Sequence, residues 1–231
     1  MTDCDRIAAA LAHHGLLLRG GFHPDARETV LAGGESAGTV LLVGNAGPGM
    51  WEAFSAQKPA GADPLDRWSG DVLGAVARQF GAEVALPSDG PPYRPFQQWA
   101  MRAEPVFPSP IGILIHPVYG LWHGYRGALL FAAVLELPAS ADPGADDCHP
   151  CDGCLDRPCL TTCPVTAFSD SGYDVQACRS HLRSPEGGRC LESSCLARRA
   201  CPVGRDYVYE AAQLAFHMAA FNGSALEQST K

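Results

Sequence analysis

The chain has 231 residues, of which 46% are hydrophobic and 18% are charged, and this composition is typical of a globular protein with a sizeable core. It excludes an intrinsically disordered chain. The formal net charge of −8 gives the chain as a whole no attraction for nucleic acid or for an anionic membrane surface.

The N-terminal segment MTDCDRIAAALAHHGLLLRG contains a short apolar run that predicts an amphipathic helix. The acidic residues Asp3 and Asp5 precede this run, where a secretory signal would carry positive charge, and no small-residue cleavage site follows. No stretch of the chain reaches the roughly 18 apolar residues that a membrane span needs. We therefore expect a cytoplasmic protein with no membrane partner.

The chain as far as about residue 138 has the patterns of mixed helix and strand. An apolar run at 39–43 predicts a buried strand that enters a loop at Gly44. Helices are predicted at 51–56, 65–80 and 96–102. Pro64 lies near the start of the second helix, where its missing N–H group costs least.

Two further strands are predicted at 111–115 and 126–137, joined by the segment HPVYGLWHGY. The second strand is apolar nearly throughout, as expected of a strand that is covered on both faces. The turn-rich segment PASADPGADD, at 138–147, predicts a linker. A closing helix is expected at 206–221, with Asp206 as its N-cap.

Nine of the ten cysteines lie between Cys148 and Cys201. Disulfides are not expected in the cytoplasm, because that compartment keeps thiols reduced. So uneven a distribution predicts a metal-binding module attached to a body that does not need one.

The spacing of the cysteines favours two iron–sulfur clusters. CDGCLDRPCLTTCP reads C-x2-C-x4-C-x3-C-P, which is close to the C-x2-C-x2-C-x3-C-P run of bacterial two-cluster ferredoxins, whose fourth cysteine binds the other cluster. A second group of cysteines also ends in Cys-Pro. The first predicted 4Fe-4S cluster therefore takes Cys151, Cys154, Cys159 and Cys201. The second takes Cys163, Cys178, Cys190 and Cys195, which leaves out Cys4 and Cys148.

Zinc is the alternative metal, because two Cys4 zinc sites would also use eight cysteines. Zinc ribbons usually pair two C-x2-C knuckles, however, whereas the second group here reads C-x4-C-x5-C-P, so iron–sulfur is favoured. A second alternative stays open at Cys148. Together with Cys151 and Cys154 it also forms a plausible three-ligand loop, so it could replace one of the assigned ligands.

The cysteine arrangement resembles the dicluster module of epoxyqueuosine reductases and of corrinoid-dependent reductive dehalogenases. YDVQACRSHL, which contains Cys178, is similar to the isolated-cysteine segment of the reductases, and CLESSCLARRACPVG is a stretched form of their last group. In those families the module follows a nitroreductase-like α+β body that binds cobalamin. The acidic catalytic residue of the epoxyqueuosine reductases has no evident counterpart here, so the catalytic residues are unknown.

A separate resemblance lies in PIGILIHPVYGLWHGYRGALLF, which is similar to the HPxFGGWxxxRG stretch of the CblC cobalamin-processing proteins. These proteins share the nitroreductase-like fold. The matching positions are His116, Pro117, Tyr119, Gly120, Trp122, Arg126 and Gly127.

Together the resemblances imply an α+β fold with two domains. A nitroreductase-like (CblC-like) α/β sandwich body is expected at 1–140, and a small, mostly helical, bacterial-ferredoxin-like module with two 4Fe-4S clusters at 141–231. The candidate cofactor-binding residues of the body are His116, Tyr119, Trp122, Tyr125 and Arg126. The alternatives are a histidine that caps a strand, aromatic side chains that pack in the core, and an arginine that pairs with an acidic residue.

The function that follows is an iron–sulfur redox protein, in which electrons from a ferredoxin- or flavodoxin-type donor pass through the two clusters to a cofactor in the body. By resemblance that cofactor is a corrinoid such as cobalamin, free or on its carrier protein, and a flavin is a further possibility. The protein is then a cobalamin-linked oxidoreductase. The alternative is a ferredoxin-like electron carrier or assembly partner with no catalytic site of its own.

Overall fold

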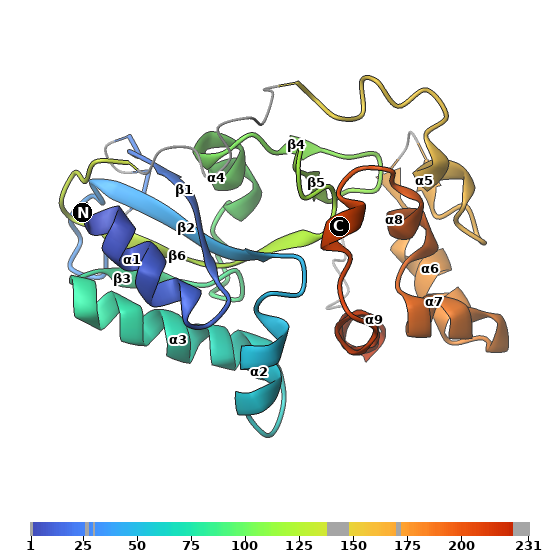
Figure 1. Cartoon of the computed structure of the whole chain (residues 1–231), viewed down its shortest axis with the longest axis horizontal. Coiled ribbons are helices and arrows are strands. Elements are labelled where there is room, and N and C mark those ends of the chain that lie inside the picture. Colours follow the sequence, from blue (N-terminus) through green and yellow to red (C-terminus); the bar gives the residue numbers. More distant parts are fainter. Residues whose placement is uncertain (1, 26–27, 30, 138–147, 170–171, 224–231) are drawn as a thin grey trace. The chain divides into compact units, whose positions relative to one another are not determined.

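The computed structural model describes residues 2–25, 28–29, 31–137, 148–169 and 172–223, so the predicted linker at 138–147 lies outside the described residues. The chain divides into two compact units (Figure 1). The first comprises Met1–Val106 and Trp122–Asp147, and the second comprises Phe107–Leu121 and Cys148–Lys231. The domain boundary near residue 140 stays a prediction. The two compact units differ from this prediction, because residues 107–121 belong to the same unit as the cysteine-rich region.

The first unit is built on an antiparallel sheet with the strand order β1-β2-β6-β3. These strands are β1 (Leu17–Phe22), β2 (Thr39–Ala46), β6 (His123–Phe131) and β3 (Glu83–Ala85). The central strand β2 is buried along almost its whole length, because it pairs with a neighbour on each side and helices cover the sheet. The predicted buried strand is thus confirmed, although it continues past Gly44.

Helices α1 (Asp3–Ala12), α3 (Pro64–Phe80) and α4 (Phe96–Ala103) pack on this sheet, and α2 (Trp51–Gln57) packs on α3. All four were expected from the sequence, and Pro64 occupies the first turn of α3. A capping box in which Thr2 and Asp5 exchange hydrogen bonds begins α1. In Figure 1, α3 runs along one side of the sheet and α4 lies on the other.

Helices are the main regular structure of the second unit. Its helices are short: α5 (Pro158–Thr161), α6 (Val175–Leu182), α7 (Gly188–Ser193), α8 (Leu196–Ala200) and α9 (Ala211–Gly223). Two short strand pairs join them: β4 (Phe107–Pro108) with β5 (Leu114–Ile115), and β7 (Phe168–Ser169) with β8 (Gly172–Tyr173). The mixed helix and antiparallel sheet of the two units confirm the α+β class.

Three predicted boundaries were wrong. The strand predicted at 111–115 is reduced to Leu114–Ile115, because Gly112 with φ of +81° makes a turn before it. The strand predicted at 126–137 runs instead from His123 to Phe131. The closing helix begins at Ala211, and Asp206 lies in a 3-10 turn before it. The extended segment between the turn and the helix contains Tyr209, which is buried against the guanidinium group of Arg198.

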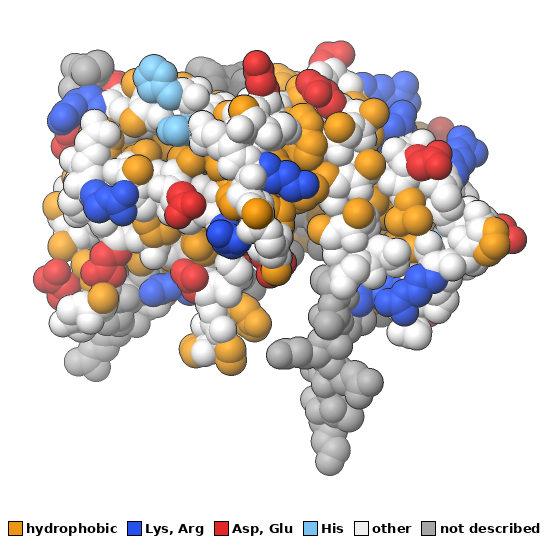
Figure 2. Space-filling model, turned by 90° about the horizontal axis from the view of Figure 1, so that it is seen from below, with side chains coloured by type: hydrophobic (Ala, Val, Ile, Leu, Met, Phe, Trp, Pro, Cys, Tyr) orange, Lys and Arg blue, Asp and Glu red, His pale blue; other side chains and the backbone are white. Residues whose placement is uncertain are grey.

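No helix in the described part of the chain is both long enough and apolar enough to cross a lipid bilayer. On the face that Figure 2 shows, basic and acidic side chains are interspersed. The excess of acidic residues therefore does not gather into one patch on that face.

Candidate functional site

The structure brings four of the predicted ligands together in the second unit, and we call Cys151, Cys154, Cys159 and Cys201 the first set. Burial raises the pKa of the Cys151 thiol to about 11, and the neighbouring thiols of Cys201, Cys159 and Cys154 add to the rise. The pKa of Cys159 is raised by burial and then by Cys201 and Cys154. Each ionised thiol disfavours the ionisation of its neighbours, and a bound cation offsets this repulsion.

The other four predicted ligands, Cys163, Cys178, Cys190 and Cys195, form the second set. Burial raises the pKa values of Cys190 and Cys195, and Cys178 and Cys163 contribute to both shifts. All four line one small cavity, of about 20 Å³. The rest of its lining is apolar except for His181. In each set the shifts come first from burial and then from thiols of the same set.

Sulfur atoms of both sets accept hydrogen bonds from backbone N–H groups. In the first set, Leu160 donates to Cys159 and Val203 donates to Cys201. In the second set the donors are Ala167 to Cys163 at 3.3 Å, Leu196 to Cys190, and Ala197 and Arg198 to Cys195. Each of these bonds favours the thiolate over the thiol, and the thiolate is the form that binds metal.

The two sets share one hydrophobic environment. A core cluster around Ile115, Leu121 and Phe168 contains Cys201, and members of both sets pack against it: Cys151, Cys159, Cys163 and Cys195. Cys201 and Cys195 flank the single short helix α8, so the chain enters the helix from one set and leaves it at the other. This arrangement places the sets next to each other.

The remaining two cysteines are outside both sets. Cys4 is buried in the first unit, where its thiol donates to the Glu136 carbonyl at 3.2 Å. Burial, followed by the charge of nearby Asp3, raises its pKa. Cys148 is exposed. Its neighbour His149 has a structural role, because its Nδ1 accepts the Cys151 N–H and its Nε2 lies 3.0 Å from the Pro108 carbonyl.

Among the described residues, no three His, Cys, Asp or Glu side chains form a group that could hold a metal ion. A tetrahedral zinc ion needs sulfur atoms about 2.3 Å from one centre, whereas the larger cubane takes one thiolate at each of four iron corners. The ligand roles of the eight cysteines stay predictions.

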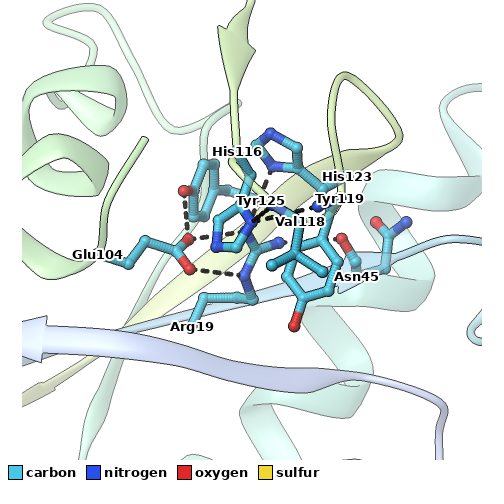
Figure 3. Close-up of polar contacts among 8 residues, drawn as sticks. All are labelled: Arg19, Asn45, Glu104, His116, Val118, Tyr119, His123 and Tyr125. Atoms are coloured by element: carbon cyan, nitrogen blue, oxygen red, sulfur yellow. Dashed lines mark hydrogen bonds and ion pairs between the residues drawn. The ribbon is translucent and has the colours of Figure 1, made fainter. Parts of the chain in front are cut away.

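His116 lies in the second unit, in a tight loop that follows β5 and ends at Leu121. Its Nδ1 accepts N–H groups from Val118 at 3.1 Å and Tyr119 at 3.2 Å (Figure 3), so the ring is held with Nδ1 unprotonated. Its ring stacks on Tyr119 at a centroid distance of 4.3 Å. Both residues are buried, at 2% and 9% exposure. Their side chains therefore help to order the loop.

The loop is joined to the cysteine sets through its end. The Arg198 guanidinium donates to the Leu121 carbonyl through Nε at 3.0 Å and Nη2 at 2.5 Å. Because Arg198 sits in α8 between Cys195 and Cys201, it ties this helix to the loop. Its neighbour Arg199 donates to the Ser193 carbonyl.

Tyr125 belongs to a buried polar network in the first unit (Figure 3). Its hydroxyl donates to Glu104 Oε1 at 2.5 Å, and Arg19 clamps the same carboxylate through Nη2 at 2.8 Å and Nε at 3.1 Å. Burial and the charge of Glu104 raise the pKa of Tyr125. Arg19 also donates to the Asn45 carbonyl and lies 3.4 Å from His123 Nδ1. The Tyr125 hydroxyl is thus hydrogen-bonded within the protein.

Trp122 is 1% exposed, and Arg126 is half-buried in β6. The five residues expected to bind a cofactor therefore divide between the units, with His116 and Tyr119 in the second and Trp122, Tyr125 and Arg126 in the first. Their role in binding stays a prediction. Arg19 and Glu104 were missed, and the signal that could have found Arg19 is a lone charge inside the apolar run LLLRGGF.

Comparison with solved structures finds proteins of similar fold. The crystal structure of a B12-trafficking protein CblC from C. elegans, a homologue of human MMACHC, matches with a TM-score of 0.51 over 99% of this chain and 97% of that chain. Sequence identity is 14%. The likeness shows the fold. No family model matches the sequence, and no curated protein matches it either.

Proposed function

We propose that the second unit holds two 4Fe-4S clusters and that the protein is a redox protein that delivers electrons to a corrinoid. The observation that carries the proposal is the grouping of the cysteines. Spacing in the sequence divides eight of them crosswise between two sets. The four of the second set line one cavity, and Cys151, Cys159 and Cys201 of the first set lie at one core cluster. When bound, such clusters supply one-electron transfer at potentials that hydrogen bonds and burial adjust.

The residues fit this group in three respects. Four thiols line a single cavity in the second set, which matches the four ligands of a cubane. Backbone N–H groups point at the sulfur atoms and so favour the anionic thiolates. Apolar side chains surround both sets, which limits the access of water.

The corrinoid part of the proposal rests on two independent likenesses. The HPVYGLWHGYRG segment resembles the CblC proteins, and a solved structure of similar fold is described as a B12-trafficking CblC. The body is accordingly proposed to be nitroreductase-like, and the activity to be cobalamin reduction or processing, with a ferredoxin- or flavodoxin-type donor. The second candidate is an electron carrier without a catalytic site, which is favoured by the burial of His116, Tyr119 and Trp122 inside the protein.

The cluster content is tested by anaerobic purification followed by iron and sulfide analysis. We expect about eight iron and eight sulfide per chain, the sum of two four-iron clusters. Cys159→Ser and Cys190→Ser, one from each set, are each expected to lose about half of both. The matched control is Cys148→Ser, which is expected to keep the full content. Stoichiometric zinc without sulfide in the wild-type protein would overturn the proposal, and loss of iron in the control would move a ligand to Cys148.

Corrinoid binding is tested separately, by titrating the cluster-loaded protein with cobalamin and recording the absorption spectrum. We expect a shift to the base-off form, followed by reduction of the cobalt when an electron donor is added. The cluster-depleted Cys159→Ser/Cys190→Ser protein is expected to bind without reducing. Clusters present with no spectral shift would leave the electron carrier as the function, and a yellow chromophore that survives cluster removal would indicate a flavin instead.

A further inference from the structure

One polar side chain lines the cavity of the second set besides the cysteines. His181 lies on α6, three residues after Cys178, so the two side chains share a face of the helix. The other lining residues are apolar: Pro164, Val165, Phe168, Leu182, Leu196, Ala197 and Met218. Apart from His181, the cavity is therefore lined by cysteines and apolar side chains.

The Nε2 atom of His181 is buried and has no hydrogen-bond partner among the described residues. Leaving a buried polar group unpaired costs about 1–3 kcal/mol, so such a group in a folded protein calls for an explanation. The Gly187 backbone approaches this residue closely, because a Cβ atom on Gly187 would lie 2.2 Å from the His181 carbonyl oxygen.

We propose that the Nε2–H group of His181 donates a hydrogen bond to a sulfur atom of the cluster bound by the second set, and thereby raises the reduction potential of that cluster. The inference rests on the proposed function. The four cysteines already fill the four iron corners, so the imidazole acts as a donor and a positioning residue, not as a ligand. Reduction adds negative charge to the sulfur atoms, and a donor stabilises the reduced state more than the oxidised state.

A second side-chain donor supports this reading of the second set. The Tyr173 hydroxyl lies beside the Cys178 thiol, within hydrogen-bonding reach. Its ring stacks on Phe168, which also lines the cavity, at a centroid distance of 4.6 Å. With His181, the second set would receive donors from two side chains in addition to its backbone N–H groups.

The test is a redox titration of the cluster-loaded, full-length protein, monitored by electron paramagnetic resonance. In His181→Phe, which removes the donor and keeps a flat ring, we expect the reduction equilibrium of one cluster to fall about tenfold, which is a 59 mV lower midpoint for one electron. The other cluster is an internal control and is expected to keep its midpoint. Tyr173→Phe should lower the midpoint of the same cluster. His181→Gln retains an N–H donor and is expected to restore most of the shift.

A measurement on the unmodified protein guards against a variant that fails to fold. In protein labelled with 15N-histidine, the reduced cluster is expected to show a weak hyperfine coupling to one imidazole nitrogen. Two outcomes would overturn the inference and leave the proposed function standing. The first is that both clusters of His181→Phe keep their midpoints, and the second is that the two-cluster wild type shows no nitrogen coupling. A wild-type protein without clusters would overturn both.

Discussion

Replacing Arg19 with methionine is expected to lower the free energy of unfolding of the first unit by about 3–5 kcal/mol. Arg19 is 1% exposed, and its guanidinium group makes two contacts with the Glu104 carboxylate, at 2.8 and 3.1 Å. The substitution keeps the length of the side chain but leaves Glu104 buried without its cation. An uncompensated buried charge is among the few single changes that cost so much.

Urea unfolding followed by tryptophan fluorescence measures this loss in the right part of the molecule, because all four tryptophans lie in the first unit. The matched control is Asp3→Asn, which breaks the exposed Arg6–Asp3 pair and is expected to cost about 1 kcal/mol or less. An Arg19→Met variant no less stable than this control would contradict the prediction.

A double-mutant cycle separates the ion pair from simple packing. Glu104→Leu alone leaves Arg19 buried without its carboxylate and is expected to cost about as much as Arg19→Met. The double variant Arg19→Met/Glu104→Leu removes both charges and is expected to cost clearly less than the sum of the single changes. Additive losses would mean that each side chain acts through packing only. The Tyr125 hydroxyl donates to Glu104 and loses its partner in both Glu104 variants. This lost hydrogen bond accounts for the cost that is expected to remain in the double variant.

This network was not predictable from the sequence, whereas the two proposed cysteine sets are read from it directly. Glu104 follows Arg19 by 85 residues, and no periodicity connects a strand residue to the end of a distant helix. Strand β1 was missed for a related reason. Arg19, Gly20 and Gly21 interrupt its apolar pattern, and the pairing register with β2 shifts between Leu18 and Gly21.

The cysteines differ because the residues that a metal site would need can be proposed from local spacing. Short intervals such as Cys151-x2-Cys154 fix which thiols can approach one centre, and the two Cys-Pro ends suggested the exchange of Cys163 and Cys201 between sets. The N–H donors to the sulfurs and the orphaned Nε2 of His181 depend on side-chain and backbone directions, which spacing does not give. The loop with His116 likewise shares a unit with residues beyond 147, although the sequence places it in the body.

Two glycines join that loop to the chain after the last cysteine. Gly120, with φ of +57°, is so close to the turn after Cys201 that an added Cβ atom would lie 2.1 Å from the Val203 carbonyl oxygen. Gly204, with φ of +73°, faces the other way, and its Cβ would lie 2.3 Å from the Tyr119 carbonyl. Val203 also donates its N–H to Cys201. The contact therefore fixes the loop and a cysteine of the first set together.

Gly204→Ala is expected to destabilise this contact by about 3 kcal/mol, because it adds strain at positive φ to a clash with backbone atoms that cannot rotate away. The His116 and Gly120 N–H groups, which bond each other's carbonyls at 2.9 Å, should then exchange hydrogen about 100-fold faster, at tenfold per 1.4 kcal/mol. Gly112→Ala is the matched control. Gly112 has φ of +81° but open space around it, so strain alone is expected to raise exchange by about tenfold or less. Equal rates in the two variants would show that the close backbone approach contributes nothing beyond the strain.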